Sequence, residues 1–168
     1  MKGLLNKTLI IFLTTMIFLS LSACSKKNNE PNVGITAEII SVTDQQFQGI
    51  GTSGIKDPAK EDFKIFTFKL DEENSKNIKN RRILVPDFKK IFEDTKDDLY
   101  WFGNSYIRDN GNENTAEYLY EITLYTRGLD EDFLRKILNS NEVIISWLAE
   151  DGQQKEKRIK VGDLAVFK

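Results

Sequence analysis

Hydrophobic and polar residues alternate along several short stretches of the chain, a pattern typical of half-buried β-strands. The first stretch starts at Val33 and places Ile35, Ala37 and Ile39 on one side. The run 63–70 is rich in aromatic and branched side chains and predicts a second strand. We expect further short strands at 82–85, 99–107, 118–126, 143–148, 156–161 and 164–167.

Helical patterns are fewer. Residues 87–93 place apolar side chains at helical spacing behind Pro86, which predicts one or two helical turns. The clearest helix begins at Asp130, an N-cap residue followed by acids, and carries an apolar stripe over 133–138. Because helices do not alternate with strands, a parallel α/β fold is disfavoured. The chain is expected to be mainly β, an immunoglobulin-like antiparallel β-sandwich with one short inserted helix near residues 130–138.

The first 24 residues differ in composition from the rest. Lys2 and Lys7 precede an apolar run over 9–19, which is too short to span a bilayer comfortably and is typical of a secretory signal. The run leads into Leu21-Ser22-Ala23-Cys24, which resembles the lipobox of bacterial lipoproteins. That resemblance implies that a diacylglycerol is attached to Cys24 and that cleavage makes Cys24 the first residue. Two acyl chains anchor a protein far more firmly than one.

The chain therefore divides into three expected parts. Residues 1–23 form a lipoprotein signal peptide, and residues 24–32 are a polar, lipid-anchored tether without hydrophobic periodicity. Residues 33–168 form a single β-sandwich domain, long enough for one core of its own. We expect this domain to be held at the extracytoplasmic face of the cell membrane.

The amino-acid composition excludes several common kinds of active site and metal site. The chain has no histidine and one cysteine, Cys24, so it lacks the commonest zinc ligand, the usual general base and any disulfide. Its 24 basic and 26 acidic residues give a net charge of -2, without the concentrated basic face that nucleic acids require. We expect no catalytic residues, no metal, no cofactor and no nucleic-acid partner.

Two loops carry partial motifs. Residues 49–54 spell G-x-G-x-x-G, but Pro58 breaks the helix that should follow in a dinucleotide site, so a loop or bulged edge is favoured. Residues 109–114 offer oxygen ligands at alternate positions, which calcium prefers. The spacing departs from the EF-hand loop because Tyr120 occupies the twelfth place. A solvated hairpin tip is favoured there, and weak calcium binding stays an alternative.

The densest aromatic cluster is Tyr100-Trp101-Phe102. Successive strand residues face opposite ways, so one aromatic face is exposed unless both faces of the sheet are covered. Tyr125 is also expected to be exposed. Exposed aromatic side chains bind sugars, peptides or proteins, which makes Tyr100, Phe102 and Tyr125 the candidate binding surface.

The overall layout suggests a class of protein. The aromatic cluster before a hairpin, and Gly128-Leu129-Asp130 leading into a helix followed by the strand 143–147, resemble small surface lipoproteins of Gram-positive bacteria, commonly of unknown function. The function expected is that of a membrane-anchored, non-enzymatic binding or accessory domain with a protein or wall-polymer partner. The alternative is a carboxylate-dependent hydrolase of cell-wall glycans, which requires two acids facing a cleft.

Replacing Cys24 with alanine is predicted to release the protein from the membrane fraction or to leave the signal uncleaved, because the modified side chain is gone. Fractionation of cells and the apparent mass of the product measure both effects. Unchanged membrane retention with normal processing would contradict the assignment.

Overall fold

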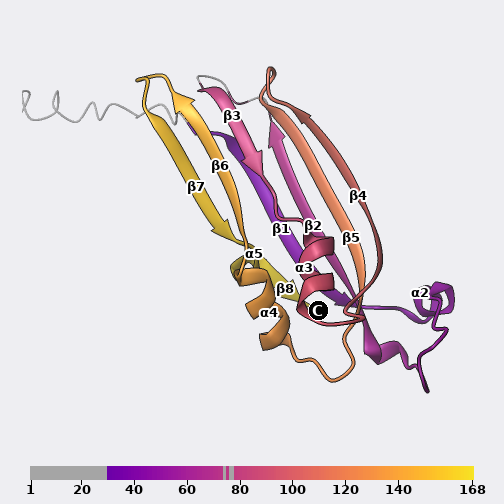
Figure 1. Cartoon of the computed structure of the whole chain (residues 1–168). Coiled ribbons are helices and arrows are strands. Elements are labelled where there is room, and N and C mark those ends of the chain that lie inside the picture. The colour runs from indigo at the N-terminus through magenta and orange to yellow at the C-terminus, as the bar shows by residue number, and fades with distance from the viewer. Residues whose placement is uncertain (1–29, 74, 76–77) are drawn as a thin grey trace, which may run out of the picture.

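The computed structural model describes residues 30–73, 75 and 78–168, so Cys24 and the leader lie outside the described residues. Two sheets make up the fold (Figure 1). The strands are β1 (Asn32–Ser41), β2 (Phe63–Glu73), β3 (Ile78–Leu84), β4 (Tyr100–Asn110), β5 (Thr115–Tyr125), β6 (Glu142–Ala149), β7 (Gln154–Lys160) and β8 (Ala165–Phe167). The larger sheet has the order β4-β5-β2-β1-β8, with β8 parallel to β1 and the other neighbours antiparallel. The smaller sheet has the antiparallel order β3-β6-β7.

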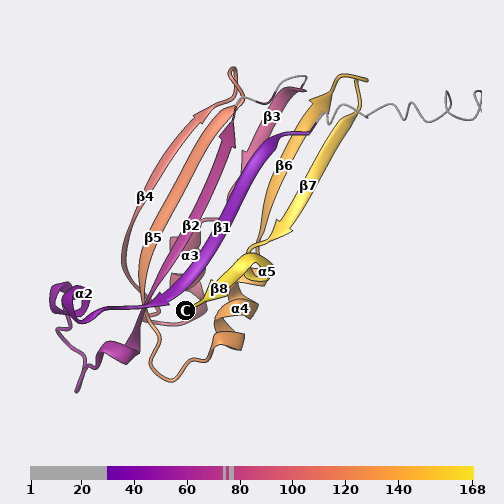
Figure 2. The same cartoon turned by 180° about the vertical axis from the view of Figure 1, so that it is seen from behind.

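Short helices gather at one end of the strands (Figures 1 and 2). Asp87 and Asp130 cap two of them by accepting hydrogen bonds from the backbone N–H groups three residues later, at 3.1 and 2.8 Å. The helices are α2 (Asp44–Gly49), the 3₁₀ turn η1 (Lys60–Asp62), α3 (Phe88–Thr95), α4 (Glu131–Asn139) and α5 (Val161–Leu164). None of the helices in the described part of the chain is both long and apolar enough to cross a lipid bilayer.

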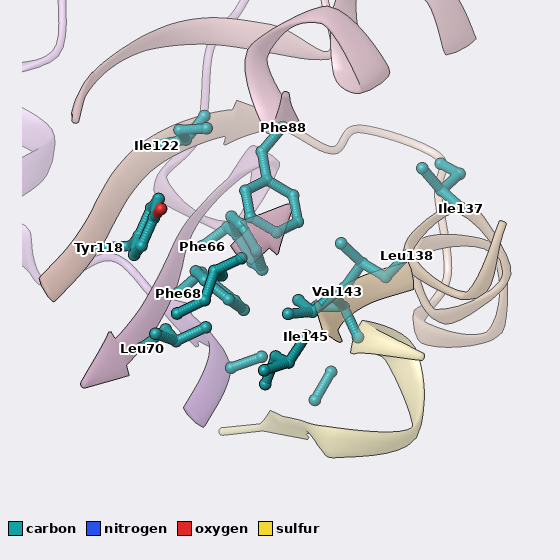
Figure 3. Packing of buried hydrophobic residues seen from close by; sticks show 14 of the residues in the cluster. Phe66, Phe68, Leu70, Phe88, Tyr118, Ile122, Ile137, Leu138, Val143 and Ile145 are labelled. Atoms are coloured by element: carbon teal, nitrogen blue, oxygen red, sulfur yellow. The ribbon is translucent and has the colours of Figure 1, made fainter. Parts of the chain in front are cut away.

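The main core lies between the two sheets (Figure 3). Alternate residues of β2 point inward, and Phe66, Phe68 and Leu70 are completely buried. They face Val143 and Ile145 of β6. Helix α3 adds its two buried aromatic rings, Phe88 and Phe92, which pack edge-on against Phe66 with ring centroids 5.0 and 5.4 Å away.

The mainly β prediction is confirmed, with each predicted strand and helix present at shifted bounds. Three elements were not predicted, one of them the 3₁₀ turn η1. Helix α5 replaces the end of the strand expected at 156–161, and α2 lies in the segment 42–62, which has no clear hydrophobic period. The apolar stripe of α4 is also narrower than predicted: Leu134, Ile137 and Leu138 are buried, whereas Phe133 is 37% exposed.

A second, smaller core lies outside the larger sheet. Phe63 and Ile65 point away from the main core at one end of β2, where Val42 and Ile50 of the 42–62 segment cover them. Thr43 begins α2 with a capping box in which the Thr43 and Gln46 side chains each accept a backbone hydrogen bond. The segment therefore acts as a lid over this end of the sheet.

The glycine loop forms part of that lid. Gly49 ends α2, so these glycines follow a helix and do not lead from a strand into one. Gly54 has a φ of +88°, which glycine adopts without steric strain. The Trp101 indole donates a hydrogen bond of 2.9 Å to the Gly51 carbonyl and ties the loop to β4.

Leu134→Ala is predicted to lower the free energy of unfolding by about 2 to 5 kcal/mol, because Leu134 is 1% exposed and its removal leaves a cavity. Phe133→Ala on the same helix is the matched control, and a smaller loss is expected because its side chain is already partly in water. Urea unfolding of both variants measures the difference. Equal losses would show that the docked face of α4 is wrongly assigned.

Candidate functional site

A bulge near the start of β4 decides where the aromatic side chains point. Tyr100 lies opposite Leu124, but Phe102 lies opposite Thr123, because one extra residue is inserted between them. Leu124 belongs to the main core and the neighbouring Thr123 faces the other way. Tyr100 and Phe102 consequently lie on opposite faces of the sheet.

The outer face of β4 exposes a pair of aromatic rings. Phe102 is 45% exposed, and Tyr106, four residues further along the same face, is 49% exposed. Tyr106 lies opposite the partly exposed Leu119 of β5. We name Phe102, Tyr106 and Leu119 the outer patch. Exposed aromatic side chains on one face of a strand make this patch a candidate contact site.

Tyr125 is on the same face but is held in the second core. Its ring lies 5.3 Å from the Phe63 ring and 5.9 Å from the Trp101 ring, measured between centroids. The Arg127 guanidinium lies 5.7 Å from the Tyr125 ring centroid. Tyr125 is half-buried, and its ring packs in the second core instead of being open to a binding partner.

Tyr100 borders a hollow of about 290 Å³ on the inner face of β4. The Lys89 ammonium lies 5.3 Å from the Tyr100 ring centroid. Burial, and then the charge of Asp87, raise the pKa of Tyr120 above its usual value. The hollow is lined by Asp87, Lys89, Tyr100, Gly103, Asn104, Ser105, Ile107, Tyr120 and Ile122.

The three residues of the predicted surface are thus not brought together. Phe102 is exposed on the outer face, Tyr100 lines the inner hollow, and Tyr125 packs in the second core. Sequence reasoning missed Tyr106 and Ile107, which are exposed on opposite faces of β4. Tyr106 could have been found from the sequence, because every second residue of a strand counted from Phe102 lies on the same face.

A buried ion-pair network closes the other end of the sandwich. Arg81 lies in a bulge of β3, where Asn80 has a φ of 51°, and its side chain is 1% exposed. Its Nε lies 2.8 Å from the fully buried Glu72 carboxylate. Its two terminal nitrogens donate to Asp109 at 2.6 and 3.0 Å, and the Tyr118 hydroxyl also donates to Asp109 at 2.6 Å. The network joins β3 of one sheet to β2, β4 and β5 of the other.

The two carboxyl groups respond oppositely to this environment. Burial raises the pKa of Glu72 above its usual value, although the charge of Arg81 opposes the rise. Burial acts on Asp109 in the same direction, but hydrogen bonds from Arg81 and Tyr118 outweigh it and hold the pKa of Asp109 below its usual value. Burial, with the hydrogen bond to Asp109, raises the pKa of Tyr118.

Hydrogen bonds within the protein already engage several side chains of the loop considered for calcium. Asp109 is bound by Arg81, the Asn110 side chain accepts from the Asn112 N–H at 3.2 Å, and the Asn114 amide donates to the Ser75 carbonyl at 3.0 Å. Across residues 30–73, 75 and 78–168, no three Asp, Glu, His or Cys side chains gather closely enough to hold a metal ion. The loop is built as a hairpin tip.

Acids also line a second hollow, of about 610 Å³, together with Lys69 and Arg108. One of these acids, Glu72, is already engaged with Arg81. Another, Asp71, lies 2.9 Å from the Lys69 ammonium. The carboxylates that line the hollow are Asp71, Glu72, Glu73, Glu113 and Glu117.

Comparison of the chain with models of protein families, with curated proteins and with solved structures finds no match.

Arg81→Met is predicted to cost about 3 to 5 kcal/mol near neutral pH, because it leaves the Glu72 carboxylate buried without its cation. An acid whose pKa is raised in the folded state stabilises the fold below its usual pKa and loses that contribution as the pH rises through the raised value. Arg81→Met should therefore recover part of its lost stability as the pH is lowered from about 7 to about 4, because Glu72 then becomes protonated. Urea unfolding across this range measures it.

The exposed neighbour Arg82 supplies the control, since Arg82→Met is expected to change stability by less than about 0.5 kcal/mol. Adding Glu72→Gln to Arg81→Met should restore part of the loss at neutral pH. A loss in Arg81→Met that does not depend on pH, or that Glu72→Gln does not reduce, contradicts the assignment.

Proposed function

We propose that the chain is a lipid-anchored domain on the extracytoplasmic face of the membrane that binds a partner and has no catalytic role. The observation that carries the proposal is the outer patch, where Phe102 and Tyr106 are both nearly half exposed on one strand. Aromatic side chains contribute large contact areas at small entropic cost. The predicted signal peptide, residues 1–23, and the Cys24 that follows it support the anchor.

The carboxylate-dependent hydrolase has less support. A glycosidase places two carboxyl groups on either side of the bond it cleaves. The hollow beside Tyr100 has one carboxylate in its lining, Asp87, and the hollow of about 610 Å³ uses Glu72 in an ion pair with Arg81. The partner expected is therefore a protein or a wall polymer that is bound and left intact.

We also propose that the sandwich is immunoglobulin-like. The constant-type immunoglobulin fold faces a sheet of its first, second, fifth and fourth strands with a sheet of its third, sixth and seventh. The order β1-β2-β5-β4 facing β3-β6-β7 supports this assignment. Strand β8 is then an addition that pairs with β1 outside this set.

The double variant Phe102→Ala/Tyr106→Ala is predicted to weaken binding at least about tenfold, which corresponds to about 1.4 kcal/mol, because the rings supply the contact area. The full chain in lipid vesicles is offered purified wall polymer and, separately, solubilised surface proteins. The melting temperature should stay unchanged because both rings are exposed.

Leu84→Ala/Val166→Ala is the matched control, since these apolar side chains are 44% and 48% exposed on other strands. It should bind as the parent chain does. Equal weakening by both double variants would refute the outer patch as the contact surface. Release of soluble sugars from the wall polymer would instead support the hydrolase.

A further inference from the structure

The two sheets have four edge strands, and three of them carry features that prevent further pairing. Strand β8 has three residues, and β3 contains the bulge at Asn80. Strand β7 carries charged side chains at five of its seven positions. Short length, bulges and charge are the ordinary means by which proteins protect a sheet edge.

Strand β4 has its bulge at one end, between Tyr100 and Phe102, and its charges at the other, so its centre lacks this protection. It has 11 residues, and it lies at the end of the larger sheet with β5 as its one neighbour among the described strands. Its central residues 102–107 carry no charge, and residues 104–108 are all exposed, so both faces of the strand are open there. Both views place β4 and β7 at opposite sides of the molecule, so β4 is free of the smaller sheet (Figures 1 and 2).

We propose that β4 pairs antiparallel with β4 of a second copy of this chain, about a two-fold axis at Ser105. The pairing joins the two larger sheets into one continuous sheet and bonds backbone groups that an edge strand leaves unpaired. An axis normal to the sheet keeps each residue on its own face, so inner residues meet inner residues. A closed two-fold contact of this kind stops at two copies.

The sequence of β4 is self-complementary in this register. Ile107, which is 53% exposed, faces Gly103 of the second copy, where no side chain competes for the space. Gly103 is required in its own subunit as well, since a Cβ there would lie 2.7 Å from the Glu121 carbonyl oxygen. On the outer face Tyr106 meets Asn104, and Arg108 meets Phe102, where a cation and an aromatic ring attract.

The charged residues of β4 also favour a second copy of this chain as the pairing strand. The charged residues of β4 are Arg108 and Asp109, at the end of the strand that follows its uncharged centre. A two-fold axis at Ser105 places Arg108 opposite Phe102 and Asp109 opposite Trp101, so no two like charges face each other. An unrelated extended peptide could use the same backbone groups, but nothing in its sequence would be matched to Gly103 and Ile107 at once.

The pairing also enlarges the outer patch, because Phe102 and Tyr106 of both copies then lie side by side on one face. The dimer does not depend on the proposed function: the copies would pair even if the patch bound no partner, and the tests are separate.

Cross-linking at the axis tests the pairing in the full chain in membranes. Residues directly opposite in antiparallel strands have Cα atoms about 4.5 to 5.5 Å apart, within disulfide range. Ser105→Cys should therefore form a disulfide with itself under mild oxidation and give a product of twice the chain mass. The parent chain sets the background from Cys24, and Lys157→Cys on the exposed edge β7 is the matched control.

The register is tested by mixing two variants. Asn104→Cys and Tyr106→Cys should cross-link when expressed together, and neither should do so alone, because identical residues away from the axis lie beyond about 7 Å. Ile107→Lys should reduce the molar mass of the detergent-solubilised chain by half in light scattering, while Leu84→Lys on β3 leaves it unchanged.

Three results would overturn the proposal. The first is a yield of cross-linked Ser105→Cys no higher than that of the parent chain or of Lys157→Cys. The parent chain could scatter light as a single copy at all concentrations. The Ser105→Cys product could contain a different protein, in which case β4 receives a strand from another partner.

Discussion

The larger sheet is wider than the smaller one can cover, and most features of the molecule follow from this. Five strands face three, so parts of the inner face of the larger sheet need other cover. Helix α3 supplies Phe88 and Phe92 over β2, and α4 buries Leu134, Ile137 and Leu138 at the same end. The chain then returns through α5 to β8, which extends the larger sheet beyond β1. Among the described residues, no such cover reaches the inner face of β4 at Ser105 and Ile107, and the hollow lies in this uncovered strip.

Two bulges determine what this uncovered region presents. The bulge in β3 lets Ile78 and Arg81, which are three residues apart, both point between the sheets, where Arg81 pairs with Glu72 of β2 and Asp109 of β4. A buried arginine is costly unless it is paired and hydrogen-bonded, and here every partner comes from the opposite sheet. The bulge in β4 separates Tyr100 from Phe102 and leaves the latter exposed. One bulge therefore fixes the position of β4, and the other fixes which of its aromatic rings face outward.

The sequence predicted the elements well where side chains alternate, and poorly where the backbone departs from the alternation. The inward set of β2 is readable because Phe66, Phe68 and Leu70 keep a period of two. The faces of Tyr100 and Phe102 are not readable, because an inserted residue carries no mark in the sequence. Arg81 would be expected in water because it is charged, although it keeps the period of two with the buried Ile83. Tyr125 was expected to be exposed because it lies on the face opposite the inward residues of β5. The segment 42–62, which covers it, has no periodic pattern that would predict this contact.

The proposed lipid anchor would favour pairing at the unprotected edge of β4. Confinement to a membrane raises the effective concentration of one copy near another, so weak backbone pairing suffices to hold two copies together. A two-fold axis that relates two chains anchored in one membrane must stand perpendicular to that membrane. The proposed axis at Ser105 is normal to the larger sheet, so the joined sheet would lie flat along the membrane. The axis keeps each face on its own side, and the outer patches of both copies therefore point the same way and act as one surface.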